Sequence, residues 1–350
     1  MTLDPTLRAL EPGDARAVHR LASDPDVART GGGSPYDFED AWIARLATAA
    51  PDRHLFLGAF DGDALLGVGI LDAQVAVRRR HVGRVAILVA SHVRRRGIGS
   101  RLLSALVDSG ERWFGHLRLE LSVQADHEAA IGLYRKHGFE IETHARADML
   151  RDGVLVDAVG MARLRPGFVA PAELGEPPPV PARGDRLAPI VRARRKSDAA
   201  QMARLHSEPS VMEGTWQMPF QTESAWAARF DATPPGSTVL LAEVDGAIVG
   251  SSGLFPIGAG GRKSHAASFG ISVHPSAQGC GVGDALMRAI LDQADHWLGL
   301  RRVELDVYVD NDRARALYER HGFVTEGRCH MMALRRGTYV DSFTMARVRL

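Results

Sequence analysis

Hydrophobic residues in the second half of the chain follow helical spacing in some stretches and strand spacing in others. One helix is predicted by four apolar residues on a common face, Leu286, Ala289, Ile290 and Trp297. Alternation predicts a hairpin in TVLLAEVDGAIVGSSGLF, with its turn at Asp245-Gly246. Further elements are expected in ASFGISVHP (strand), RRVELDVYV (strand), DRARALYERHG (short helix) and CHMMALRRGTYVDSFTMARV (closing hairpin). Helices in SDAAQMARLHSEPSV and around Trp226 precede them, so the pattern predicts an α/β domain on a mixed sheet.

The same order of elements is written twice in this chain. Gly97 and Gly281 are 184 positions apart, and the same offset pairs Tyr134 with Tyr318. Residues 91–164 align with 275–348 without a gap, and roughly a third of the positions are identical. A period this long indicates two whole domains. We expect domains at 1–164 and 190–350, joined by a linker rich in Pro and Gly at 165–189.

Composition narrows the kind of partner. The 350 residues carry a net charge of +1, which gives no field to attract nucleic acid or a membrane surface. Two cysteines cannot form a disulfide framework, and the fourteen histidines show no metal-ligand spacing, so no metal is expected. The N-terminus lacks a signal peptide and no run of 18 apolar residues occurs. We therefore expect a soluble cytoplasmic protein.

Each copy carries a glycine-rich loop immediately before a helix. The shared pattern is Gln278 or Arg94, two residues, Gly, one residue, Gly, then the helix. Such a loop aims backbone N–H groups and a positive helix end at an anion. It lacks the lysine of a nucleoside triphosphate loop and the last glycine of a dinucleotide fingerprint. A simple turn between a strand and a helix is the alternative interpretation.

A second block follows each loop at a fixed distance, VYVDNDRARALYERHGF in one copy and VQADHEAAIGLYRKHGF in the other. Together, loop and block resemble motifs A and B of the GNAT family of N-acetyltransferases, and the resemblance covers nearly all of each half. It implies two tandem α/β domains, each a mixed central sheet flanked by helices, with acetyl-CoA as cofactor and a primary amine of a small molecule as acceptor. The C-terminal half is also similar to bacterial N-acetyltransferases that act on free L-amino acids.

The resemblance assigns the cofactor site residue by residue. The strand edges that receive the pantetheine arm would be Phe269–Val273 and Val85–Val89. In the C-terminal half the implied cofactor-binding residues are Ile271, Ser272, Val273, Gln278, Gly279, Cys280, Gly281, Val282, Gly283, Asp284 and Asn311. In the N-terminal half they are Leu88, Val89, Arg94, Arg95, Arg96, Gly97, Ile98, Gly99 and Ser100. The counterpart of Asn311 is His127, which departs from the family pattern.

The resemblance also implies the catalytic groups. Tyr318 and Tyr134 match the family tyrosine beside the sulfur of coenzyme A, and each is interpreted as a general acid or, alternatively, as a core residue. Strand alternation places Glu304 and Asp306 on one face, where either carboxylate is a candidate base. A structural carboxylate paired with an arginine such as Arg301 is the alternative. The first copy keeps Glu120 but has Ser122 opposite Asp306.

The acceptor side is the least patterned part of both halves. Trp216, Met218 and Phe220 are candidates for an apolar wall, whereas Trp226 and its match Trp42 are expected to pack a helix. We expect a competent C-terminal half, and an N-terminal half that is either active or binds cofactor only. The alternatives are a tandem enzyme like mycothiol synthase, which acetylates a cysteinyl pseudodisaccharide, and a non-catalytic acyl-CoA sensor. The chain is expected to be a monomer or a homodimer.

Overall fold

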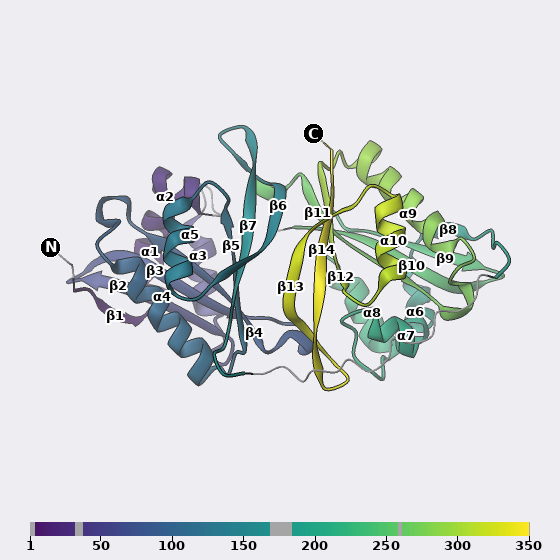
Figure 1. Cartoon of the computed structure of the whole chain (residues 1–350), viewed down its shortest axis with the longest axis horizontal. Coiled ribbons are helices and arrows are strands. Elements are labelled where there is room, and N and C mark those ends of the chain that lie inside the picture. Colours follow the sequence, from purple (N-terminus) through teal and green to yellow (C-terminus); the bar gives the residue numbers. More distant parts are fainter. Residues whose placement is uncertain (1–3, 32–37, 169–183, 258–260, 350) are drawn as a thin grey trace. The chain divides into compact units, whose positions relative to one another are not determined.

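The chain folds into two compact units, residues 1–169 and 170–350. The computed structural model describes residues 4–31, 38–168, 184–257 and 261–349, so most of the predicted linker lies outside the described residues. Each unit is an α/β domain in which helices flank a mixed sheet (Figure 1). In the described residues, no helix is long and apolar enough to cross a membrane.

The second unit contains the complete set of predicted elements. Its strands are β8 (Ile190–Ala193), β9 (Thr238–Val244), β10 (Ala247–Pro256), β11 (Ala266–Val273), β12 (Arg302–Tyr308), β13 (Val324–Arg335) and β14 (Thr338–Val348). Its helices are α6 (Ala199–Ser207), α7 (Pro209–Glu213), α8 (Glu223–Asp231), α9 (Val282–Asp292) and α10 (Asp312–Arg320). The predicted first helix is therefore two helices, because Pro209 begins a new one after Glu208 in extended conformation.

Strand order in the second unit is β8-β9-β10-β11-β12-β14-β13. Every pair in this sheet is antiparallel except β11 with β12, which is parallel. The predicted turn at Asp245-Gly246 joins β9 to β10, and both residues have positive φ, 49° and 78°. Asp-Gly is the usual sequence for a turn with two left-handed residues, so this hairpin is set by its own two residues.

Helices cover both faces of this sheet. Alternate residues of β9 point to opposite sides: Leu241 packs with α6 and α8, and Ala242 packs with α9. Figure 1 shows α9 and α10 on one side of these strands, and α6, α7 and α8 on the other. The largest buried cluster joins β11, β12, α9 and α10, and includes Tyr318 and Phe323. The core therefore fixes α10 against the strands that pair in parallel.

The first unit repeats this plan. Its strands are β1 (Thr6–Ala9), β2 (His54–Asp61), β3 (Ala64–Ala73), β4 (Val82–Val89), β5 (Arg118–Gln124), β6 (Glu140–Arg151) and β7 (Val154–Leu164), in sheet order β1-β2-β3-β4-β5-β7-β6. Its helices are α1 (Ala15–Ala22), α2 (Pro25–Thr30), α3 (Glu39–Ala47), α4 (Ile98–Asp108) and α5 (Glu128–Lys136). The single parallel pair is again central, here β4 with β5.

Both closing hairpins contain the same backbone irregularity. The pairing of β6 with β7 slips between Ala145 and Met149, and the pairing of β13 with β14 slips between Cys329 and Ala333. Inside these bulges Ala147 has φ 50° and Met331 has φ 52°. In each case the N–H group donates to an aspartate on the neighbouring strand, at 2.9 Å to Asp157 Oδ1 and 2.9 Å to Asp341 Oδ1.

Trp297 was predicted to share a face with Leu286, Ala289 and Ile290, but it does not join the buried face of the helix. This indole is 75% exposed, and its counterpart Trp113 is 82% exposed. The cause is a π-helical turn at Gln293–Trp297, which adds a residue to the helical period after Asp292. Ala294 takes the buried place instead, with no exposed surface. The first unit has the same π turn at Ser109–Trp113.

Candidate active site

Two cavities of the second unit share one wall. The larger, of about 830 Å³, is lined by the glycine loop, α10 and the end of β11. The smaller, of about 530 Å³, is lined by α8, β10 and the segment around Trp216. Six residues line both cavities: Gly214, Thr215, Ile271, Ser272, Asp306 and Tyr318. A molecule in one cavity therefore faces a molecule in the other across a short stretch of β11 and β12.

The shared wall exists because two neighbouring strands separate. β11 pairs with β12 at only three positions, from Ala266↔Arg302 to Ser268↔Glu304. From Phe269 to Val273, β11 is paired with β10 but has no described register partner in β12. This part of the strand carries the predicted contact residues Ile271, Ser272 and Val273, all of which line the larger cavity. The splayed edge offers backbone groups to a ligand with amides.

The glycine loop ends at the N-terminus of α9. Gly281 is its N-cap residue in a left-handed conformation, φ 89°, and Gly279 also has positive φ, 77°. The first N–H groups of α9 have no partner within the helix, so they are available to an anion. Val282 contributes only its backbone to this turn, because its side chain is fully buried in the core.

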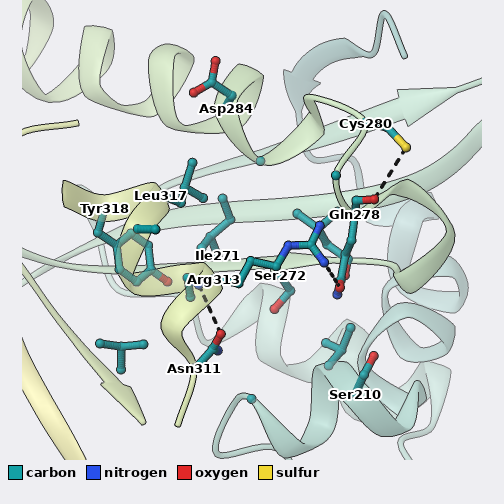
Figure 2. A pocket seen from close by; sticks show the side chains of 18 of the residues that line it. Ser210, Ile271, Ser272, Gln278, Cys280, Asp284, Asn311, Arg313, Leu317 and Tyr318 are labelled. Carbon is teal, nitrogen blue, oxygen red and sulfur yellow. Dashed lines mark hydrogen bonds between the residues drawn. The ribbon is translucent and has the colours of Figure 1, made fainter. Parts of the chain in front are cut away.

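Gln278 holds the loop to both neighbouring elements. Its amide Nε2 donates to the carbonyl of Val273 at 2.9 Å, and its Oε1 accepts from Arg313 of α10 at 2.9 Å (Figure 2). The thiol of Cys280 lies near the carbonyls of Ser276 and Gln278, at 3.9 and 3.5 Å. Cys280 therefore packs the loop, while Gln278 links the loop to β11 and α10.

Tyr318 lies on α10 between aromatic rings. Its ring centroid is 6.2 Å from that of Phe269, edge to face, and 6.0 Å from that of Phe323. Burial disfavours the phenolate and raises the pKa of Tyr318, so the hydroxyl stays protonated. It therefore presents an O–H donor in the wall that both cavities share.

Asn311 begins α10. Its Oδ1 accepts the N–H of Ala314 at 3.1 Å, which caps the helix, and the residue also lines the larger cavity (Figure 2). Its counterpart His127 stands at the same position of α5 but makes no side-chain cap. Burial, followed by the charge of Arg94, lowers the pKa of His127. The two N-caps therefore differ in a contact that fixes the helix carrying the tyrosine.

The two candidate carboxylates occupy different surroundings. Asp306 lines both cavities, and its Oδ1 accepts a hydrogen bond from Thr344 on β14 at 2.9 Å. Glu304 lines neither cavity; it accepts from Arg302 at 2.8 Å. Arg302 is 1% exposed and also binds Glu326, so it holds Glu304 in a partly buried ion network. The arginine partner is thus Arg302 rather than Arg301, and only Asp306 reaches the cavities.

The first unit keeps the cradle, which is the glycine loop together with the N-terminus of the helix that follows it, but the side chains around it differ. Gly97 caps α4 with φ 88°, Arg95 precedes it with φ 63°, and β4 pairs with β5 only from Val82 to Arg84. Burial raises the pKa of Tyr134 to about 12. Burial opposes ionisation of Glu120, but Arg79 and Arg118 outweigh it and hold the pKa of Glu120 below its usual value.

The loop of the first unit places its three predicted arginines at the surface. Arg94, Arg95 and Arg96 are exposed, and Arg94 donates to the carbonyl of Asp26 at 2.9 Å. Ser100 is hydrogen-bonded to His137 at 2.8 Å, where the second unit has Asp284 bonded to His321 at 2.8 Å. Leu88, Val89, Ile98 and Gly99 occupy the places of Ser272, Val273, Val282 and Gly283. Ser122 stands where Asp306 stands in the second unit.

The smaller cavity has aromatic walls and two cations. Arg229 lies over the ring of Trp226 at 4.9 Å, and Arg194 lies over the ring of Phe230 at 4.4 Å. Trp226 Nε1 and the Ser342 hydroxyl are buried and have no hydrogen-bond partner among the described residues. The sequence predicted only that Trp226 packs a helix. In the structure Trp226 packs in the core around α6 and α8 and also lines the smaller cavity.

The predicted apolar wall is only partly present. Trp216 lines the smaller cavity, but Met218 is not among its lining residues. Phe220 is 95% exposed and has φ 60°, so its side chain does not form part of a wall. The residues that sequence reasoning missed are Arg194, Arg229 and Ser342, which lie far apart in the chain and match no motif.

Comparison with known proteins identifies the family of the chain. The acetyltransferase (GNAT) family matches residues 15–139 and 201–323. An L-amino acid N-acetyltransferase of Escherichia coli is 38% identical over 160 residues, 46% of this chain and 98% of that protein. A mycothiol acetyltransferase of Geodermatophilus obscurus is 30% identical over 283 residues, 79% of this chain and 78% of that protein. A solved Sinorhizobium meliloti acetyltransferase in complex with AcCoA is 24% identical, with TM-score 0.42, over 47% of this chain and 89% of that one.

The residues around the larger cavity suit the cofactor of this family. The glycine cradle, the orphan N–H groups of α9 and the guanidinium groups of Arg186, Arg313 and Arg320 fit a ligand with several phosphates. The splayed edge of β11 fits its amide-bearing arm. The chain belongs to the acetyltransferase (GNAT) family, carries two of its domains in tandem, and is an N-acetyltransferase that uses acetyl-CoA.

Proposed function

We propose that the second unit transfers the acetyl group of acetyl-CoA to the primary amine of a small molecule. The observation that carries this proposal is the wall shared by the two cavities, with Tyr318 and Asp306 both in it. Acetyl-CoA supplies the acetyl group as a thioester, which the acceptor nitrogen attacks. Cofactor in the larger cavity and acceptor in the smaller one would meet at this wall, which converts transfer into a reaction between neighbours.

Three groups at the shared wall would have separate roles in the transfer. An amine must lose a proton before it attacks, and Asp306 is the carboxylate placed to hold or receive it. The hydrogen bond from Thr344 to Oδ1 helps to fix the orientation of Asp306 in the wall that both cavities share. Backbone N–H groups of β11 near Ile271 would stabilise the oxyanion, and the Tyr318 hydroxyl would donate to the departing sulfur.

We further propose that the acceptor is a free amino acid with an apolar side chain. Arg194 and Arg229 each spend one terminal nitrogen on protein oxygens, at 2.9 to 3.0 Å for Arg194 and 2.5 Å for Arg229, and keep other N–H donors. These donors suit an acceptor carboxylate, and the rings of Trp226 and Phe230 suit its side chain. A relative 38% identical to this chain acts on L-amino acids. A polyamine would instead meet two like charges.

Thiol release tests both proposals on the full chain. Acetyl-CoA is incubated with single amino acids, spermidine, an aminoglycoside and a short peptide, and the free thiol is measured by a chromogenic disulfide. We expect turnover with apolar amino acids and little with spermidine. Turnover with spermidine alone would overturn the acceptor assignment, and no thiol release with any amine would overturn the transfer itself.

A mycothiol acetyltransferase activity is the second candidate. The similarity to the Geodermatophilus protein runs through both units and not through one alone. Its cysteinyl acceptor also carries a primary amine, so it belongs in the same panel. A kcat/KM for this acceptor well above that of every free amino acid would favour this function.

For the first unit we propose cofactor binding without transfer. Its cradle is intact, but Ser122 replaces Asp306, the carboxylate that lines both cavities in the second unit. Its remaining candidate Glu120 is held in ion pairs with Arg79 and Arg118. Loss of all turnover when the second unit is inactivated supports this assignment, whereas residual turnover that depends on Tyr134 contradicts it.

A further inference from the structure

The segment just before β8 lies against the glycine loop of the second unit. The N–H group of Leu187 donates to the carbonyl of Cys280 at 2.9 Å. A Cβ added to Gly184 would lie 2.9 Å from Cys280 Sγ, so the two backbones pack closely here. Gly184 and Arg186 both line the larger cavity. These residues precede position 201, where the family match to this unit begins.

Arg186 runs alongside the residue that caps α9. Its Cγ and Nε would be 3.5 and 3.7 Å from a Cβ on Gly281. Its guanidinium makes no hydrogen bond or ion pair with any residue in the described part of the chain. An arginine carries five N–H donors in a rigid fork, so its place beside a helix N-terminus suits a phosphate.

The charges around this cavity add to the argument. Arg186, Arg313 and Arg320 line it, against the two carboxylates Asp284 and Asp306. Asp284 is itself bound to His321 and Arg288, at 2.8 and 2.9 Å. Burial lowers the pKa of Arg313, whose partner is the neutral amide of Gln278. Arg186 and Arg313 therefore line this cavity without a carboxylate partner among the described residues.

We propose that Arg186 is a cofactor-binding residue that pairs with a phosphate group of acetyl-CoA. This inference rests on the proposed use of the larger cavity by the cofactor. It makes the segment that leads into β8 part of the binding site, which the loop and α10 alone would leave open on that side. By the 184-residue offset the counterpart in the first copy is Thr2, so only the second copy has this cation.

Calorimetric titration with acetyl-CoA tests the assignment. The full chain carries Gly97→Val throughout, so that the first cradle is disabled and one site is observed. We expect Arg186→Ala to weaken binding roughly 10-fold or more, since a charged hydrogen-bonded pair is lost. Arg186→Lys should recover part of the loss, because it restores charge without the bidentate fork. Arg301→Ala removes an equal charge outside both cavities and should change Kd less than about twofold.

A second variant and a second ligand separate the outcomes. Gly184→Val would push the segment away from Cys280 with Arg186 unchanged, and should weaken binding in the same direction. With 3′-dephospho-CoA, an unchanged effect of Arg186→Ala assigns the pyrophosphate, and a vanished effect assigns the 3′-phosphate. Wild-type affinity in Arg186→Ala, with the melting temperature unchanged, would overturn the role of Arg186 alone. No binding by the parent chain would overturn both this role and the proposed function.

Discussion

Tyr318→Phe isolates a single atom of the proposed chemistry. The ring keeps its contacts with Phe269 and Phe323, because only the hydroxyl is removed. That hydroxyl makes no hydrogen bond with any residue in the described part of the chain. Its loss should therefore leave the free energy of unfolding within about 0.5 kcal/mol of wild type. An effect on rate would then report on the reaction and not on the fold.

The expected magnitude follows from the burial of Tyr318. In surroundings of low polarity its protonated hydroxyl donates a hydrogen bond to a developing thiolate that is stronger than in water. Hydrogen bonds to charged groups contribute about 1.5–3 kcal/mol. We expect kcat to fall about 100-fold, which corresponds to roughly 2.7 kcal/mol of transition-state stabilisation. The KM for acetyl-CoA should change much less, because the loop and the β11 edge that bind it are intact.

The assay is thiol release at saturating acetyl-CoA, with kcat and both KM values compared between variants. Tyr134→Phe is the matched control, because Tyr134 packs against Phe139, the counterpart of Phe323, with ring centroids 5.9 Å apart. It should change kcat less than about twofold if the second unit carries turnover. A kcat for Tyr318→Phe within threefold of wild type, with an unchanged melting curve, would refute the role of the hydroxyl.

Three further results are expected. Asp306→Asn should lower kcat at least 100-fold at pH 7, and by a smaller factor at high pH, where the acceptor amine is already neutral. A pH–rate profile of the variant identical to that of wild type would contradict this. Gly281→Val should abolish acetyl-CoA binding to the second unit in calorimetry, because φ 89° strains a β-branched residue and opens the cradle; unchanged affinity would contradict it. Burial lowers the pKa of His206 to about 4, so the unfolded state binds a proton that the folded state does not between pH 6.5 and about 4. Stability should fall by about 3 kcal/mol as pH drops through this window, and His206→Gln should flatten that part of the curve in urea unfolding.

Local sequence signals were sufficient for much of the fold. The Asp245-Gly246 turn, the strand alternation and the glycine before α9 act through neighbouring residues, so each can be recognised without tertiary knowledge. The internal repeat added long-range information, because it showed that the same elements occur twice. The prediction for Trp297 failed because a π turn changes the helical period, and no residue type in QADHW indicates such a turn.

The residues that line the acceptor cavity could not be predicted from local sequence patterns, for a physical reason. Arg194 lies between β8 and α6, Arg229 lies on α8, and Ser342 lies on β14. These elements are distant in the sequence, and only the fold brings the three residues to one cavity. The two carboxylates show the same limit. Strand alternation places Glu304 and Asp306 on one face. Which of them binds Arg302 and which lines a cavity depends on the position at which β11 and β12 stop pairing.

The paired bulges carry a consequence for the history of the chain. A residue other than glycine at positive φ costs of order 1 kcal/mol, yet Ala147 and Met331 both adopt it, each secured by an aspartate across the strand. The copies differ at the position of Asp306, which is Ser122 in the first, and at that of Asn311, which is His127, yet both retain this costly shape. The main-chain path is thus common to both copies where side chains of the site differ, so each copy can serve as a template for substitutions in the other.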